Sequence, residues 1–275
     1  MTIAIIGIGV MGESLLTGLI QSGWDVAGIR TADTRESKRD EVARKYGVWT
    51  GTSVEAVQGA QTVVLVVKPQ DISDLLYDIR PWLEPGALVI SLAAGVTTAA
   101  IERLVGDHPV VRVMPNTAAL VREGMAAVCP GSTATGDHLA QAEKILTAVG
   151  KVQVISEKYM DAVTAISGSG PAYVMFVAEA MIDAGVMLGL PRATATDLVK
   201  QTVYGSAKLL VESGEHPTVL KENVTSPGGT TAAALRAFED HRVKAAFIDA
   251  MEAACKRSEE LGRAEDDEAS DGFQR

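Results

Sequence analysis

The sequence of 275 residues has little of what builds cross-linked or metal-stabilised folds. Its two cysteines, Cys129 and Cys255, lie far apart and belong to no CxxC motif. None of the four histidines has an HExxH or similar ligand spacing, and there is no GxSxG nucleophile motif. We therefore expect no disulfide framework and no metal site.

Long hydrophobic runs are also missing. The longest clean apolar stretch lies near Val63–Val67, and a membrane helix needs about 20 such residues. Val174–Leu190 is apolar but contains Glu179 and Asp183, which is typical of a buried helix. A strand-like run begins at Ile3, which leaves no room for a signal peptide. These features predict a soluble, cytoplasmic protein without a membrane partner.

Positive charge is scarce. Lys and Arg together number 25 against 35 Asp and Glu, which gives a net charge of −10 and argues against a nucleic-acid partner. Five acids and one base lie in residues 264–275, so residues 263–275 are predicted to be an acidic, disordered tail. Hydrophobic residues make up 47% of the chain, enough for a core, which excludes disorder of the whole chain.

Predicted strands and helices alternate up to about residue 156. The first strand is Thr2–Ile6, and the β-branched run Thr62–Val67 is typical of a parallel strand covered on both faces. This alternation predicts an α/β domain with a doubly wound sheet of the Rossmann type. From Lys158 onward the pattern is helical, with apolar residues over wide arcs. We expect a partner subunit to cover those arcs.

The strongest local motif is GIGVMG at residues 7–12, directly after the first strand. In this context a GxGxxG motif is typical of a dinucleotide site. Gly7 permits a tight turn, Gly9 lets the backbone approach a pyrophosphate, and Gly12 lets helix and strand pack closely. The amides of the helix N-terminus attract the anion. Residues 1–157 are therefore predicted to be a dinucleotide-binding domain.

The choice of dinucleotide remains open from the residues alone. Asp33, near the end of the second strand, suits the adenosine ribose of NAD. Thr34 and Arg35 follow at once and suit a 2′-phosphate, as in NADP. Lys68 follows another strand, Val63–Val67, and is either placed to contact the dinucleotide or a solvated lysine before Pro69. The small residues of SLAAG at 91–95 leave room for a nicotinamide ring.

A second motif, SPGGTT at residues 226–231, precedes a helix in the C-terminal half. Backbone amides there make either an anion site, which suits a small carboxylate because no Lys or Arg is present, or an ordinary helix cap. The C-terminal half of the chain has no obvious His or Lys that could polarise a carbonyl group. This favours a substrate that needs little acid catalysis, such as an imine.

Together these motifs resemble the pyrroline-5-carboxylate reductase family. The resemblance implies NAD(P)H-dependent reduction of 1-pyrroline-5-carboxylate to L-proline, the last step of proline biosynthesis, with NADPH as the usual cofactor and NADH as a possible one. It also implies a helical substrate and dimerisation domain at residues 158–262, homodimers, and further assembly into decamers. The segments that carry it are IGIGVMG (6–12), VVKPQ (66–70), SLAAGV (91–96), RVMPNT (112–117), DAVTAISGSGPAY (161–173), DAGVMLGLPR (183–192), QTVYGSAKLL (201–210), SGEHPTVLKENVTSPGGTTAAAL (213–235) and RSEELG (257–262).

The resemblance also implies roles for individual residues. Thr231 is implied as the catalytic residue, whose hydroxyl meets the ring nitrogen. Asp33, Thr34 and Arg35 depart from the uncharged pair that many relatives have there. The implied substrate residues are Ser226, Gly228, Gly229, Thr230, Thr231 and Glu157, and the implied cofactor residues are Ile6, Gly7, Ile8, Gly9, Val10, Met11, Thr34, Arg35, Ser53, Val67, Lys68, Ala93 and Asn223.

Two other functions compete with this prediction. A β-hydroxyacid dehydrogenase would place a lysine on the long helix, but Met160–Leu188 contains none. A non-catalytic, dinucleotide-sensing protein is disfavoured because both the cofactor and the substrate motifs are intact.

Overall fold

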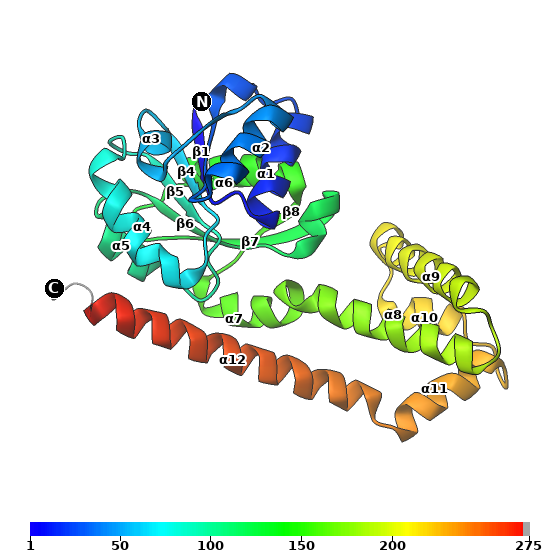
Figure 1. Ribbon diagram of the computed structural model, residues 1–275. Helices are drawn as coiled ribbons and strands as arrows, with labels where there is room; N and C mark the ends of the chain where they lie inside the picture. The colour runs from blue at the N-terminus through cyan, green and yellow to red at the C-terminus, as the bar shows by residue number, and fades with distance from the viewer. Residues whose placement is uncertain (272–275) are drawn as a thin grey trace. The chain divides into compact units, whose positions relative to one another are not determined.

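The computed structural model describes the backbone of residues 1–271 and the side chains of residues 1–262. The chain divides into two compact units (Figure 1): Met1–Ser169 together with the chain from Ala254 onward, and Gly170–Ala253. This division comes later than the predicted boundary after residue 157, because Met160 is fully buried against Ala127 and Cys129 of the sheet domain.

Within the described residues, the first unit contains an eight-stranded sheet in the order β3-β2-β1-β4-β5-β6-β7-β8. Neighbouring strands run parallel to one another, except that β6 and β7 pair with each other in antiparallel fashion. The strand order reverses between β1 and β4, which is where doubly wound sheets bind ligands. The predicted fold class is thus confirmed. The strands are Ile3–Ile6, Ile29–Ala32, Trp49–Gly51, Thr62–Leu65, Leu88–Ser91, Val110–Met114, Gly124–Pro130 and Gly150–Val154, in order β1 to β8.

Side chains alternate across the sheet and build one hydrophobic core on each face. Ile3 and Ile5 of β1 pack into one core, whereas Ala4 and Ile6 pack into the other. The first core is covered by α1 (Val10–Gln21), α2 (Glu36–Tyr46) and α6 (Gly136–Leu146), and the second by α3 (Ser53–Val57), α4 (Ile72–Ile79) and α5 (Thr98–Val105).

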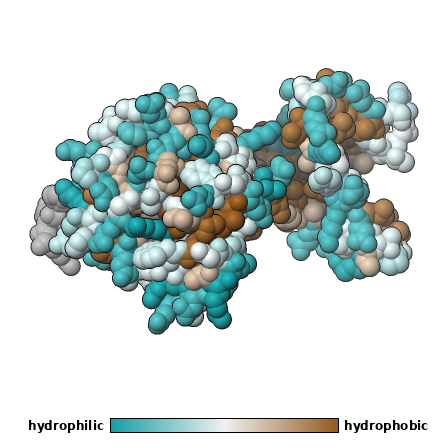
Figure 2. All heavy atoms as spheres, turned by 90° about the horizontal axis from the view of Figure 1, so that it is seen from above, coloured by the Kyte–Doolittle hydropathy of each residue, from teal (hydrophilic) through white to brown (hydrophobic). Residues whose placement is uncertain are grey.

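The second unit is helical and buries little surface by itself. No residue of α8 (Gly170–Met187) is buried, and α9 (Arg192–Ser213) buries only Ala195 and Val199. Hydrophobic side chains therefore remain on its surface (Figure 2), among them Phe176 at 70% exposure. The remaining helices are α10 (Pro217–Asn223), α11 (Thr230–Asp240) and the start of α12 (Val243–Asp271).

The expectation that Val174–Leu190 is a buried helix is not met within this chain. Among the described residues, Glu157–Met187 is a helical stretch that is long and apolar enough to cross a membrane, by length and composition only, and little of it is buried. It joins η6 (Glu157–Tyr159), α7 (Met160–Val163), the π-helical turn η7 (Thr164–Gly168) and α8. An exposed apolar surface as large as that of this helical stretch is typical of an interface with another protein or a membrane.

The C-terminal part of α12 packs on the first unit. The Ser258 hydroxyl donates a 2.7 Å hydrogen bond to Asp161 Oδ1, and a Cβ placed on Gly95 would lie 3.5 Å from the Cα of Gly262. Helix α12 is traced as far as Asp271. The acidic, disordered tail at residues 263–275 stays a prediction. Residues 272–275 of that tail lie outside the described part of the chain.

Candidate functional site

Two hollows lie at the carboxyl ends of β1, β2 and β4 to β6. The larger has a volume of about 920 Å³ and the smaller about 330 Å³. Both are lined by Gly9, Val66, Val67 and Lys68, so these residues form their common border. A dinucleotide that crosses the switch point of such a sheet has one half on each side of that border.

The glycine loop has the shape that a diphosphate requires. Gly7 has φ +96°, and a Cβ there would lie 2.4 Å from the Val66 carbonyl oxygen. A Cβ on Gly12 would lie 2.0 Å from the Gly7 oxygen, whereas a Cβ on Gly9 would enter open space. Gly9 is the N-cap of α1 and supplies no side-chain cap, so the first amides of the helix are left for an anion. The loop therefore fits a dinucleotide.

Asp33 is saturated by donors of the protein itself. Its Oδ1 accepts from the Arg35 backbone N–H at 3.0 Å and from Arg35 Nε at 2.9 Å. Its Oδ2 accepts from the Ile8 N–H at 3.1 Å and from Arg35 Nη2 at 3.2 Å. Since a carboxylate has about four lone-pair sites, Asp33 has none left for ribose hydroxyls. Of the two alternatives left open by the sequence, the geometry disfavours the NAD-selective role of Asp33.

The rest of the larger hollow carries the residues predicted for the adenosine half. Thr34, Arg35 and Ser53 line it together with Arg39, and Ile6, which is predicted for the diphosphate, lines it as well. Arg39 Nη1 donates to the Asp33 carbonyl at 2.7 Å, which fixes the turn after β2. Burial raises the pKa of Asp33, but the hydrogen bonds from Arg35 and Ile8 outweigh it and hold that pKa below its usual value.

The smaller hollow brings together residues predicted for the diphosphate, Val10 and Met11, and residues predicted to line the cofactor, Val67 and Lys68. Val10, Met11, Val67 and Lys68 line it, together with Leu92, Ala94, Met114 and Pro115. Ala93 lies between two lining residues but is itself 2% exposed, and its N–H donates to Ser91 Oγ at 3.3 Å. Ala93 therefore presents less surface to this hollow than its two neighbours do, and its contact with the cofactor stays a prediction.

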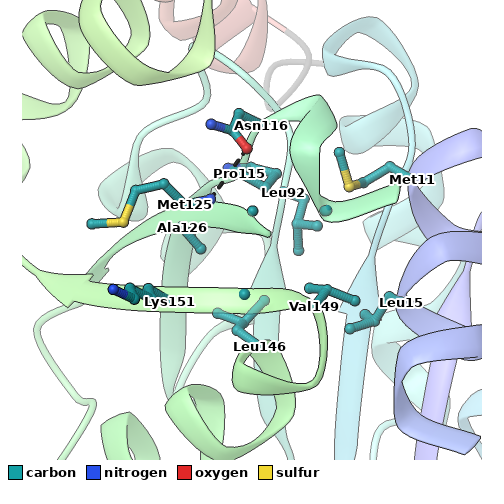
Figure 3. Close-up of a pocket in the computed structure, with 13 residues that line it drawn as sticks. Met11, Leu15, Leu92, Pro115, Asn116, Met125, Ala126, Leu146, Val149 and Lys151 are labelled. Carbon is teal, nitrogen blue, oxygen red and sulfur yellow. Dashed lines mark hydrogen bonds between the residues drawn. The ribbon is translucent and has the colours of Figure 1, made fainter. Parts of the chain in front are cut away.

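Asn116 is a residue of this region that the sequence reasoning did not single out. Its Oδ1 accepts from the Met125 N–H at 3.1 Å, and its Nδ2 donates to the Ser167 carbonyl of the π-helical turn at 3.2 Å. The Met125 bond borders a small apolar cavity whose walls include Met11, Leu92 and Pro115 (Figure 3). The signal that could have identified it was its place directly after β6, at the ligand-binding edge of the sheet.

Glu157, predicted to contact the substrate, is engaged within the first unit. Oε1 accepts from the Thr98 N–H at 2.8 Å and from Arg112 Nη1 at 3.0 Å, and Oε2 accepts from the Thr98 hydroxyl at 2.6 Å. Burial raises the pKa of this carboxyl, but the bonds from Thr98 and Arg112 outweigh it and lower the pKa below its ordinary value. The carboxylate connects the start of α5 to β6, which indicates a structural role.

The second motif forms a helix N-terminus in the second unit. Gly229 is the N-cap of α11 without a side-chain cap, and Thr230 and Thr231 are the first residues of the helix. Gly228 has φ +69°, and a Cβ on Gly229 would lie 2.4 Å from Ser226 Oγ. Asn223 ends the preceding helix α10. The motif thus presents uncapped amides beside two threonine hydroxyls, as a carboxylate site requires.

No group of three or more His, Cys, Asp and Glu side chains among the described residues could hold a metal ion.

Comparison with known proteins bears on the whole chain. Residues 157–261 match the family described as "Pyrroline-5-carboxylate reductase dimerisation", and residues 2–95 match "NADP oxidoreductase coenzyme F420-dependent". The pyrroline-5-carboxylate reductase of Corynebacterium melassecola is 42% identical over 267 residues, which covers 95% of this chain and 99% of the relative. The pyrroline-5-carboxylate reductase of Escherichia coli K12 is 40% identical over 264 residues, which covers 95% of this chain and 98% of the relative.

Solved structures agree with these relatives. A pyrroline-5-carboxylate reductase of Coxiella burnetii has a TM-score of 0.90 at 39% identity and covers 94% of this chain and 98% of its own. The Plasmodium falciparum enzyme, solved with NADP bound, has a TM-score of 0.85 at 32% identity and covers 95% and 98%. The chain belongs to the pyrroline-5-carboxylate reductase family.

Proposed function

We propose that this protein reduces 1-pyrroline-5-carboxylate to L-proline with NADPH, with NADH as a secondary cofactor. The observation that carries the proposal is 42% identity to a pyrroline-5-carboxylate reductase over nearly the full length of both chains. The uncapped loops at Gly9 and Gly229 support it, since each offers amides to one of the two anions that the reaction requires.

The first unit binds the cofactor, which supplies the hydride when bound. Ile6 to Met11 hold its diphosphate, while Thr34 and Arg35 meet the 2′-phosphate. Ser53 lies by the adenosine. Val67, Lys68 and the segment around Ala93 line the path to the nicotinamide, and Asn223 contributes from the helical unit.

The SPGGTT segment binds the substrate. Amides from Gly228 to Thr231, with the Ser226 hydroxyl, hold the carboxylate, and the Thr231 hydroxyl oxygen accepts a hydrogen bond from the protonated ring nitrogen. C5 of the protonated imine accepts a hydride, the C=N bond becomes a single bond, and the nitrogen retains its proton, which yields proline. Because a protonated imine is already electrophilic, orientation by these groups is sufficient.

The helices of residues 157–261 form a homodimer, and dimers associate further into decamers. The homodimer is supported by the match to a dimerisation family over this range and by the exposed apolar surface of α8, whereas the decamer rests on the family resemblance alone. The enzyme works in the cytoplasm, in keeping with two free cysteines, because thiols stay reduced there.

A direct assay tests the activity. Purified protein, NADPH or NADH and pyrroline-5-carboxylate are mixed, and nicotinamide absorbance is followed. Loss of absorbance that depends on the substrate is expected, faster with NADPH. If neither NADPH nor NADH is oxidised, the proposed activity is wrong. Binding of the cofactor without turnover would favour the non-catalytic, dinucleotide-sensing alternative. Turnover of a β-hydroxyacid instead would favour the dehydrogenase alternative.

A further inference from the structure

The Asp33–Arg35 pair is asymmetric in its exposure. The Arg35 side chain is 62% exposed and the Asp33 side chain 7%. The carboxylate therefore lies behind the guanidinium, and Arg35 is the member that faces solvent at the larger hollow, which it lines with Thr34 and Arg39. An incoming anion at this place meets Arg35 first.

Arg35 retains capacity for a second acceptor while it is paired. It uses Nε and Nη2 on Asp33, and a guanidinium has about five N–H donors in a planar fork. The remaining donors can reach a phosphate without breaking the pair. The carboxylate thus orients the fork, but its negative charge opposes that of the phosphate.

Arg39 differs from Arg35 in this respect. In this turn Arg39 Nη1 donates to the carbonyl oxygens of Asp33 at 2.7 Å and Thr34 at 3.4 Å, which are neutral acceptors. The two arginines therefore contribute unequally to the local charge, because only Arg35 is bonded to a carboxylate here.

We propose that Asp33 is a positioning residue that acts through Arg35: it holds the guanidinium by an ion pair and limits the preference of this pocket for a 2′-phosphorylated dinucleotide. The proposal rests on the proposed function, and it assigns to Asp33 a role opposite to that of the ribose-binding acid at this position in NAD enzymes. The affinity for NADPH is therefore lower than it would be if Arg35 and Arg39 had no carboxylate beside them. The affinity for NADH, which has no 2′-phosphate, is nearly independent of Asp33.

The test is binding of NADPH and NADH to purified full-length variants, measured by nicotinamide fluorescence. Asp33→Asn keeps an oxygen for the Ile8 N–H and removes the charge, so NADPH should bind about five-fold tighter while NADH changes by less than about two-fold. Arg35→Gln should weaken NADPH about ten-fold, and adding Asp33→Asn to it should recover part of that loss, because the carboxylate left without Arg35 repels the phosphate. Asp40→Asn removes a carboxylate from the exposed surface of α2 and serves as the matched control.

Two results would overturn the proposal. Equal weakening of both cofactors by Asp33→Asn would make Asp33 only an anchor of the glycine loop, and selective weakening of NADH would make it a ribose ligand. These binding ratios are independent of pyrroline reduction, so an inactive wild-type protein that binds NADPH would contradict the proposed reaction and leave this test intact. A wild-type protein that binds neither NADPH nor NADH would overturn both the proposed reaction and the proposed role of Asp33.

Discussion

Arg112 on β6 donates a 3.0 Å hydrogen bond to Glu157, 45 residues later, at the point where the chain leaves the sheet. Arg112 is 8% exposed at its side chain and Glu157 31%. A guanidinium so far removed from water depends on its partner, because an unpaired buried charge is strongly destabilising. The pair, with Thr98, therefore fixes the start of the helical region on the sheet.

Replacing this carboxylate should reduce stability more than catalysis. Glu157→Gln leaves Arg112 without its counter-charge and should lower the free energy of unfolding by about 2 kcal/mol at pH 7, while the KM for the substrate changes less than about two-fold. Urea unfolding and steady-state kinetics measure the two effects, with the exposed Glu239→Gln as control. A large rise in KM with unchanged stability would restore Glu157 as a substrate residue.

The same pair predicts a pH dependence. The folded-state pKa of Glu157 lies below its ordinary value of 4.5, so the stabilisation is present above that pH and is lost as pH falls through the lower, folded pKa. The difference in unfolding free energy between wild type and Glu157→Gln should therefore shrink on acidification below about pH 4.5. A difference that grows on acidification would contradict the paired carboxylate.

Two substitutions in the glycine loop should separate cofactor binding from stability. Gly9→Ala adds a Cβ that meets nothing within 4 Å, so stability should stay within about 0.5 kcal/mol while NADPH affinity falls at least about ten-fold. Gly12→Ala places its Cβ 2.0 Å from the Gly7 oxygen and should destabilise the fold by about 2 kcal/mol or more. Thermal unfolding and NADPH titration separate the two. Wild-type affinity in Gly9→Ala would mean that the diphosphate does not approach there.

Thr231 tests the substrate site. Thr231→Ala removes the hydroxyl at the start of α11 and should lower kcat/KM for pyrroline-5-carboxylate about 100-fold, with the Kd for NADPH unchanged. Thr231→Ser keeps the hydroxyl and should restore most of the activity. Full activity of the alanine variant would remove Thr231 from the mechanism.

The exposed face of α8 tests the dimer. Phe176 is 70% exposed there, and Phe176→Glu should shift the protein toward monomers by at least about ten-fold in the dimer dissociation constant. Tyr77→Glu, on α4 of the sheet domain and at 80% exposure, is the matched control and should remain dimeric. Light scattering coupled to size exclusion distinguishes the species. Dimers of Phe176→Glu as tight as wild type would place the interface elsewhere.

Local patterns predicted most of the sheet domain, because each buried strand and its helix are coded by adjacent residues. GIGVMG predicted both the turn at Gly7 and the packing at Gly12, and the structure has both. The three-residue strand β3 was missed because Trp49–Gly51 is too short for a periodicity to emerge.

Contacts between distant segments could not be predicted in this way. The Ser258–Asp161 bond joins residues 97 positions apart, and nothing in either segment specifies the other. The same holds for Glu157 and Arg112, and for the saturation of Asp33, since the residue type allowed a ribose ligand and only the fold supplied the Ile8 amide. Long-range pairs depend on topology rather than on local pattern.

Isotope transfer shows whether the protein delivers a hydride to C5 of a cyclic imine. NADPH carrying deuterium in the transferred position at C4 of the nicotinamide is incubated with pyrroline-5-carboxylate and the protein, and the product is analysed by mass spectrometry. We expect L-proline with one deuterium at C5, formed in proportion to the cofactor oxidised. Cofactor oxidation without labelled proline, or no oxidation at all, would contradict it.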